Sequence, residues 1–324
     1  MNCLLKALVA LLAFTPVAAQ QQPYQPPQHN QPAPLIGGAD RREVAALAEL
    51  GVQIERDRTA RDLLGEHRRL ATALANLQPQ RRGKVDAYVV SVALDSDPVF
   101  GREAREAGRV LARRYKADGR AIVLAGTDGS GPSALPMGSP ESLAAALARV
   151  AELMDRKEDV LVLYATTHGA PQGIVYNDGD QGFGLIAPAR LWRVLRELGI
   201  ENRLLLVSAC YAGQFVPMLM ADRTAIVTAS AADKTSFGCE ADNDWTFFGD
   251  ALVNQALRKP QPLRRAVAEA RGLIARWERE GRLDASDPQI SIGRGAGRWL
   301  AALERDLPPA APGVGRPATA ALRR

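Results

Sequence analysis

The sequence predicts an α/β protein in which a mostly parallel sheet is covered by helices on both faces. Short runs of Val, Ile, Leu and Ala recur without polar alternation, which is typical of strands buried on both faces. Stretches with apolar residues at helical spacing lie between these runs. Alternation of strands and helices favours parallel strands joined by helical crossovers. With 324 residues, of which 47% are hydrophobic and 24% charged, the chain is long enough for one large core.

The first 80 residues precede this alternation and fall into three parts. Residues 1–19 carry one lysine, an apolar run and Val17-Ala18-Ala19, which predicts a signal peptide cleaved after Ala19. Residues 20–38 are rich in Gln and Pro and predict a disordered linker. Residues 39–80 have apolar residues at helical spacing and predict an N-terminal helical segment.

The N-terminal apolar run also bears on localisation. It is shorter than the roughly 20 residues that a membrane-spanning helix needs. We therefore expect an exported protein, periplasmic or secreted, without stable membrane insertion after signal cleavage. An uncleaved N-terminal anchor is the alternative.

Residues 84–304 contain the alternation and are predicted to form one domain, followed by a flexible tail at 305–324 that is rich in Pro, Ala and Arg. Apolar runs predict strands at Val85–Leu94, Ile122–Leu124, Val160–Ala165, Leu204–Ser208 and Ala225–Ala229. Helical spacing predicts helices at Arg102–Tyr115, Ser142–Met154, Pro188–Leu198, Gly213–Met220, Phe247–Leu257 and Leu263–Arg279.

The charge pattern argues against a nucleic-acid partner. The net charge of +5 comes from scattered Arg pairs that alternate with Glu and Asp. Aromatic residues make up only 5% of the chain, and we find no RNA- or DNA-binding motif beside the basic residues. We interpret the basic residues as a solvated surface.

Two of the predicted strands end in reactive side chains. The run Val160–Ala165 leads to His168 and Gly169, and the run Leu204–Ser208 leads to Cys210. Sites in parallel sheets form at the carboxyl ends of the strands, and the spacing leaves room for one crossover between neighbouring strands. A nearby imidazole increases the reactive thiolate fraction of a cysteine. The pattern therefore predicts a hydrolase site built on a Cys/His pair.

The two motifs also resemble a known family. Tyr164-Ala-Thr-Thr-His-Gly169 and Val207-Ser-Ala-Cys-Tyr-Ala-Gly213 are similar to the His-Gly and Ala-Cys motifs of the legumain family of cysteine peptidases, whose clan includes the caspases. The resemblance covers about residues 85–257. It implies a caspase-like three-layer α/β sandwich, a peptide or protein substrate, and neither a metal nor an organic cofactor.

The resemblance further implies roles for individual residues. Cys210 is the implied nucleophile of an acyl-enzyme mechanism, and His168 is the implied general acid and base. The backbone N–H groups of Gly169 and Cys210 are the implied oxyanion site.

Legumain-type pockets combine an arginine early in the first helix with acidic groups after the strand that follows the nucleophile. Arg102 is the matching arginine, and Ser230 is expected on the pocket wall. One of Glu240, Asp242 and Asp244 matches the acidic group, with Asp242 preferred.

One position departs from the family pattern. Family members often carry an Asn two residues before the pocket arginine, where it orients the histidine. Phe100 stands there in this chain. The identity of a third catalytic group is therefore open, and a backbone carbonyl is one candidate.

The leading interpretation is a cysteine endopeptidase, with Asn or Asp as the candidate residue before the scissile bond. One alternative is a transamidase or transpeptidase that uses the same chemistry. A second is a catalytically silent scaffold domain in which Cys210 and Cys239 form a disulfide, as favoured by an oxidising compartment. Counting free thiols would distinguish the scaffold from the enzymes.

Overall fold

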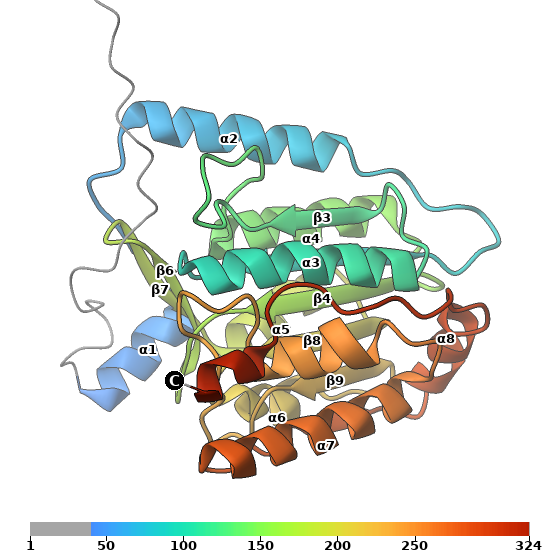
Figure 1. Ribbon diagram of the computed structural model, residues 1–324. Coiled ribbons are helices and arrows are strands. Elements are labelled where there is room, and N and C mark those ends of the chain that lie inside the picture. Colours follow the sequence, from blue (N-terminus) through green and yellow to red (C-terminus); the bar gives the residue numbers. More distant parts are fainter. Residues whose placement is uncertain (1–39, 324) are drawn as a thin grey trace, which may run out of the picture.

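The computed structural model describes residues 40–323, in which helices flank a central sheet (Figure 1) that has six strands. The strand order is β10-β9-β8-β4-β2-β3, and β10 alone pairs antiparallel to its neighbour in this sheet. The strands are β2 (Ala87–Ala93), β3 (Ala121–Leu124), β4 (Val160–Thr166), β8 (Arg203–Ser208), β9 (Thr224–Thr228) and β10 (Gln289–Ile292). The predicted α/β sandwich with a mostly parallel sheet is confirmed.

The predicted signal peptide at 1–19 and linker at 20–38 lie outside the described residues. Within residues 40–323, the helices do not combine the length and the apolar character that a bilayer crossing requires.

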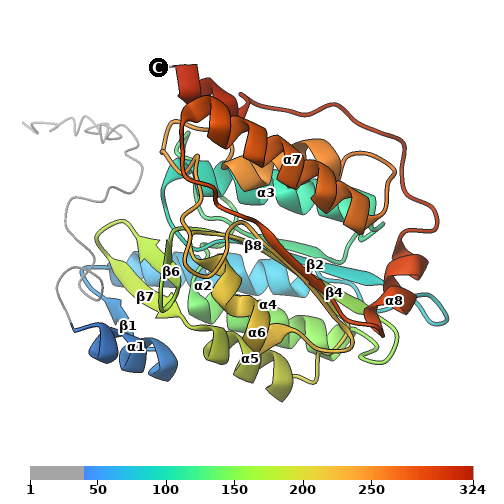
Figure 2. The ribbon, with the colours of Figure 1, turned by 90° about the horizontal axis from the view of Figure 1, so that it is seen from below.

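Each face of the sheet is covered by its own helical layer (Figure 2). Val89, Val162 and Val227 face one layer, whereas Val90, Leu161 and Ile226 face the other. This alternation follows from the two-residue period of a strand, and burial on both sides explains the uninterrupted apolar runs. The first layer contains α3 (Pro98–Arg114), the π-helix η2 (Gly249–Ala256), α7 (Leu263–Gly281) and α8 (Ala296–Leu303). The second contains α4 (Pro140–Leu153), α5 (Pro188–Glu197), α6 (Phe215–Leu219) and the inner side of α2 (Ala60–Ala75).

A smaller antiparallel sheet continues from the end of β4. Its order is β1-β7-β6-β5. The strands are β1 (Gln53–Glu55), β5 (Gly169–Ala170), β6 (Gly173–Asp178) and β7 (Gly182–Ile186), and α1 (Arg41–Leu50) packs on them. Because β5 begins directly after His168, this sheet fixes the chain on one side of that residue.

The C-terminal segment, which its composition predicts to be flexible, makes ordered contacts before and within η3 (Ala318–Arg323). The indole N–H of Trp245 donates to the Val314 carbonyl at 2.9 Å. The Arg316 and Ala318 N–H groups donate to carboxylates that precede and begin η2, at 2.6 and 2.8 Å. These bonds fasten the segment to the loop that precedes η2.

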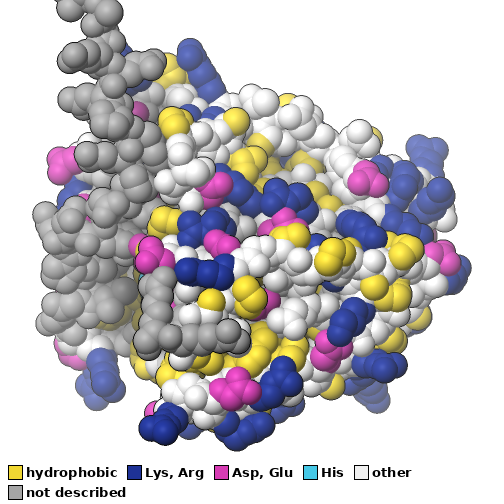
Figure 3. All heavy atoms as spheres, in the orientation of Figure 1, with side chains coloured by type: hydrophobic (Ala, Val, Ile, Leu, Met, Phe, Trp, Pro, Cys, Tyr) yellow, Lys and Arg dark blue, Asp and Glu magenta, His cyan; other side chains and the backbone are white. Residues whose placement is uncertain are grey.

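On the face of the molecule drawn in Figure 3, basic side chains are not gathered in one stripe. Figure 3 shows Lys and Arg in several groups, with Asp, Glu and apolar side chains between them. Many basic residues are also paired, as Arg58 is with Asp178 at 2.8 Å and Arg258 with Glu106 at 2.6 Å. The absence of a nucleic-acid partner stays a prediction.

Candidate active site

His168 and Cys210 follow neighbouring parallel strands. Thr166 of β4 stands opposite Ser208 of β8, and the Thr167 N–H donates to the Ser208 carbonyl at 3.1 Å. A Cβ atom added to Gly169 would overlap the carbonyl oxygen of Cys210, so only glycine fits this close approach. The sheet therefore brings the two backbones into contact, as the spacing of the motifs predicts.

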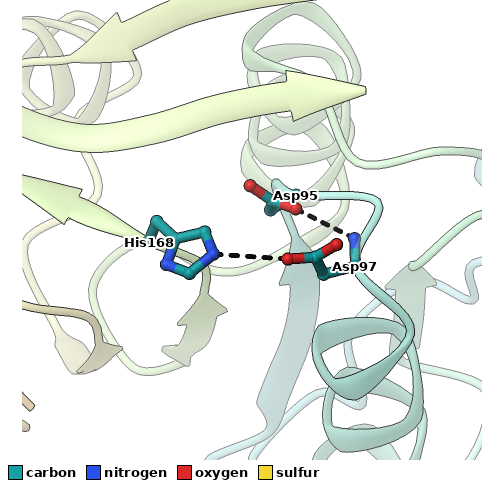
Figure 4. Close-up of side chains that lie close together, drawn as sticks. All are labelled: Asp95, Asp97 and His168. Carbon is teal, nitrogen blue, oxygen red and sulfur yellow. Dashed lines mark hydrogen bonds and ion pairs between the residues drawn. The ribbon is translucent and has the colours of Figure 1, made fainter. Parts of the chain in front are cut away.

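The two side chains nevertheless face different partners. The His168 Nε2 lies 3.4 Å from Asp97 Oδ2 (Figure 4). The Cys210 Sγ accepts the Ser236 N–H at 3.2 Å and lies 3.6 Å from the Ser236 carbonyl oxygen. Among residues 40–323, no hydrogen bond joins the imidazole to the Cys210 thiol. In the described structure the backbones at His168 and Cys210 are adjacent, but the two side chains are not hydrogen-bonded to each other.

The turn after Cys210 has an unusual backbone. Tyr211 adopts a positive φ of 56°, which is uncommon for a residue other than glycine. Its N–H donates to the Lys234 carbonyl at 2.7 Å, which holds the turn. Strained backbone of this kind is concentrated at functional sites. It ends β8 abruptly and leaves the Cys210 side chain partly exposed.

The surroundings of His168 favour its charged form. Burial lowers the pKa of the imidazole, but hydrogen bonds with Asp97 and Cys239 and the charge of Asp95 outweigh this and raise the pKa to about 11. The ring also packs edge-on against Phe100, with 5.0 Å between centroids. The imidazole is therefore held as an imidazolium at neutral pH, a form that can stabilise a thiolate.

Asp97 is the carboxylate beside the histidine, a residue that the sequence motifs do not indicate. Asp97 precedes α3 directly and comes from the loop after β2, which is the neighbour of β4. Phe100, where the family often has Asn, packs against the ring instead of donating to it. The polar stretch Asp95-Ser96-Asp97 after a buried strand was a usable signal, because the carboxyl ends of parallel strands lie at one edge.

One loop covers both reactive side chains. We call residues 231–246 the cap loop, which connects β9 to η2. Its Ser236 N–H binds the Cys210 sulfur, and its Cys239 lies close enough to His168 to raise the pKa of the imidazole. Both Cys210 and Cys239 are free thiols, so the disulfide of the scaffold alternative is not present in this structure. The cap loop therefore lies against both reactive residues.

Ser230 does not line a pocket, contrary to the sequence expectation. Its side chain is 0% exposed, and its hydroxyl donates to the Ala209 carbonyl and accepts the Ala212 N–H, both at 3.1 Å. These bonds span the Cys210 turn from behind. The structure thus places Ser230 in support of the turn, because the end of β9 lies beneath it rather than beside its open face.

The arginine expected in the pocket holds the cap loop. Arg102 donates to the carbonyl oxygens of Ala241 and Asn243 and pairs with Asp244 at 3.2 Å. The preferred acidic residue, Asp242, is not this partner, and its carbonyl instead accepts a bond from Arg316. The conformation of the cap loop sets this pairing, and the acidic residue of a substrate pocket stays a prediction.

These features define a class before any comparison: an α/β sandwich with a thiol and an imidazole at the carboxyl ends of adjacent parallel strands. Comparison with known families then finds that the model described as the Peptidase C13 family matches residues 139–289, a range that includes His168 and Cys210. The resemblance to the legumain family of cysteine peptidases is thereby confirmed. The match begins after α3, so it does not include Asp97 or Arg102.

Among solved structures, Caspase-1 from Spodoptera frugiperda is similar with 14% sequence identity and a TM-score of 0.43, over 66% of this chain and 92% of that chain. No curated protein matches the chain.

Proposed function

We propose that the protein is a cysteine endopeptidase in which Cys210 and His168 form the catalytic pair. The observation that supports this proposal is the backbone contact between Gly169, which follows His168, and Cys210 at the ends of β4 and β8. The match to a family of cysteine peptidases over the same residues supports it. Export is part of the proposal and rests on the composition of residues 1–19.

The reaction uses a thiolate and an imidazolium. The Cys210 sulfur attacks the peptide carbonyl carbon, and His168 gives its proton to the leaving amine as the C–N bond breaks. The neutral imidazole then takes a proton from water, which attacks the thioester and releases the acid. The N–H groups of Gly169 and Cys210 are the proposed donors to the oxyanion.

The cap loop has to move away from the Cys210 sulfur before this reaction can occur. The Ser236 N–H and carbonyl occupy the Cys210 sulfur in the described state. A substrate carbonyl must take their place, and the imidazole must come within reach of the Cys210 sulfur. Binding of substrate is therefore coupled to movement of residues 231–246.

Alkylation combined with peptide cleavage tests the proposal. A fluorogenic peptide library should be cleaved by the untreated protein, and the preferred residue before the scissile bond should emerge, with Asn and Asp as the candidates. Iodoacetamide should abolish this cleavage in step with labelling of Cys210, as followed by mass spectrometry of tryptic peptides. Cleavage that persists after Cys210 is fully alkylated, or a library left intact by the untreated protein, would overturn the proposal.

Asp97 is the proposed positioning residue for His168. Asp97→Asn should lower kcat by about 100-fold, because the neutral amide holds the imidazolium less well, a loss within the range of general acid–base catalysis. KM should change little, since Asp97 is not proposed to touch the substrate. Steady-state kinetics with the preferred peptide measure both constants.

The conservative variant Asp97→Glu serves as the control for this prediction. It should recover part of kcat, because a carboxylate is again available near Nε2. Equal kcat in the wild type and Asp97→Asn, or a loss confined to KM, would remove Asp97 from this role.

A further inference from the structure

Asp95, Asp97 and His168 gather around one small space at the carboxyl edge of the sheet (Figure 4). One ligand atom from each lies within 4.8 Å of the others. Asp95 is only 3% exposed, and its Oδ1 accepts the Asp97 N–H at 2.9 Å. Phe100 packs edge-on against the imidazole. The three groups therefore lie near one another before any ion arrives.

The spacing of these atoms fits a metal ion better than a strong hydrogen bond. A charged N–H to carboxylate hydrogen bond usually spans about 2.7–2.9 Å, whereas Nε2 of His168 and Oδ2 of Asp97 are 3.4 Å apart. In a tetrahedral zinc site with bonds of about 2.0–2.1 Å, neighbouring ligand atoms are about 3.3–3.4 Å apart. The pair thus already has the separation of two zinc ligands, and only the Asp95 carboxylate has to move closer.

We propose that Asp95, Asp97 and His168 form a binding site for a divalent transition metal ion, with Zn²⁺ as the ion that fits best. Two carboxylates supply negative charge, and the imidazole selects against Mg²⁺ and Ca²⁺, which prefer oxygen ligands alone. Asp97 and His168 are partly exposed, which gives the ion a route to the site and leaves a fourth position for water.

The ion would be an inhibitor rather than a cofactor. Bound to Nε2, it would replace a proton of the His168 imidazolium, which is released to solvent, and so remove the proton that His168 gives to the leaving amine. This consequence rests on the proposed peptidase function, whereas metal binding itself does not.

Binding is tested first without reference to activity. In the full chain carrying Cys210→Ala, isothermal titration with Zn²⁺ and the visible absorption of added Co²⁺ should show one site per chain. Asp95→Asn in this background keeps an acceptor for the Asp97 N–H but removes a charged ligand, and should weaken binding by about 10- to 100-fold. The exposed Asp284→Asn is the matched control and should bind as the parent does. Absence of a site, or binding unchanged by both Asp95→Asn and His168→Ala, overturns the proposal.

The activity arm separates the two proposals. Zn²⁺ should inhibit peptide cleavage by the otherwise unmodified chain, and Asp95→Asn should shift the inhibitory concentration upward by the same factor as its binding constant, each variant being compared with its own rate in chelator. Zn²⁺ binding that depends on Asp95 in a chain without peptidase activity supports the metal site and overturns the peptidase. Peptidase activity without Zn²⁺ binding supports the peptidase and overturns the metal site.

Discussion

Replacing Cys210 by alanine should lower peptide hydrolysis by about 10⁴-fold or more, as removal of the nucleophile does in other hydrolases. Cys239→Ala should retain a rate within about tenfold of the wild type, because the imidazole keeps Asp97 as its partner. The two thiols have different surroundings: Cys239 lies close enough to His168 to raise the pKa of the imidazole, whereas the Cys210 sulfur accepts the Ser236 N–H.

Thermal unfolding accompanies the kinetics of both variants. Neither thiol is fully buried, so each replacement should leave the melting temperature nearly unchanged. Loss of activity in Cys239→Ala together with full activity in Cys210→Ala would identify Cys239 as the nucleophile. That result would also mean that the alignment with the family's Ala-Cys motif misplaces the reactive thiol.

The large sheet could be predicted because strands buried on both faces appear in the sequence as uninterrupted apolar runs. Runs such as Val160–Ala165 and Leu204–Ser208 became β4 and β8 with nearly the same bounds. The hairpin of β6 and β7 was missed, because its strands contain Gly, Asn and Asp and one end of the hairpin is less buried. The helix α3 begins at Pro98, earlier than expected, since proline is well suited to the first helical position.

Only the site residues that directly follow predicted strands could be predicted from the sequence. His168 and Cys210 follow apolar runs, and parallel pairing then brings them together. Asp97 and the contacts of the cap loop depend on how loops fold back over that edge, which no local pattern encodes. Arg102 is an example. Its position near the site was predicted, but the cap-loop carbonyls to which its guanidinium donates depend on tertiary packing.

Replacing Glu103 by alanine should cause the largest loss of stability, about 4 kcal/mol in the free energy of unfolding. Glu103 is 0% exposed, and its carboxylate accepts the Tyr164 hydroxyl at 2.6 Å, the Thr166 hydroxyl at 2.7 Å and the Thr246 N–H at 2.7 Å. Burial and the charge of Glu103 raise the pKa of Tyr164 well above its usual value, so the phenol stays a donor. Alanine would leave all three donors buried without an acceptor.

Urea denaturation of Glu103→Ala, Glu103→Gln and Arg109→Ala measures this effect. Glutamine keeps one acceptor oxygen and should lose about half as much stability as alanine, while Arg109 is exposed on the same helix and should change stability by less than about 0.5 kcal/mol. A loss below about 1 kcal/mol for Glu103→Ala would show that the donors find other acceptors. Because Glu103 joins α3 to β4 and to the end of the cap loop, its removal should also speed alkylation of Cys210, as the loop over the thiol loses an anchor.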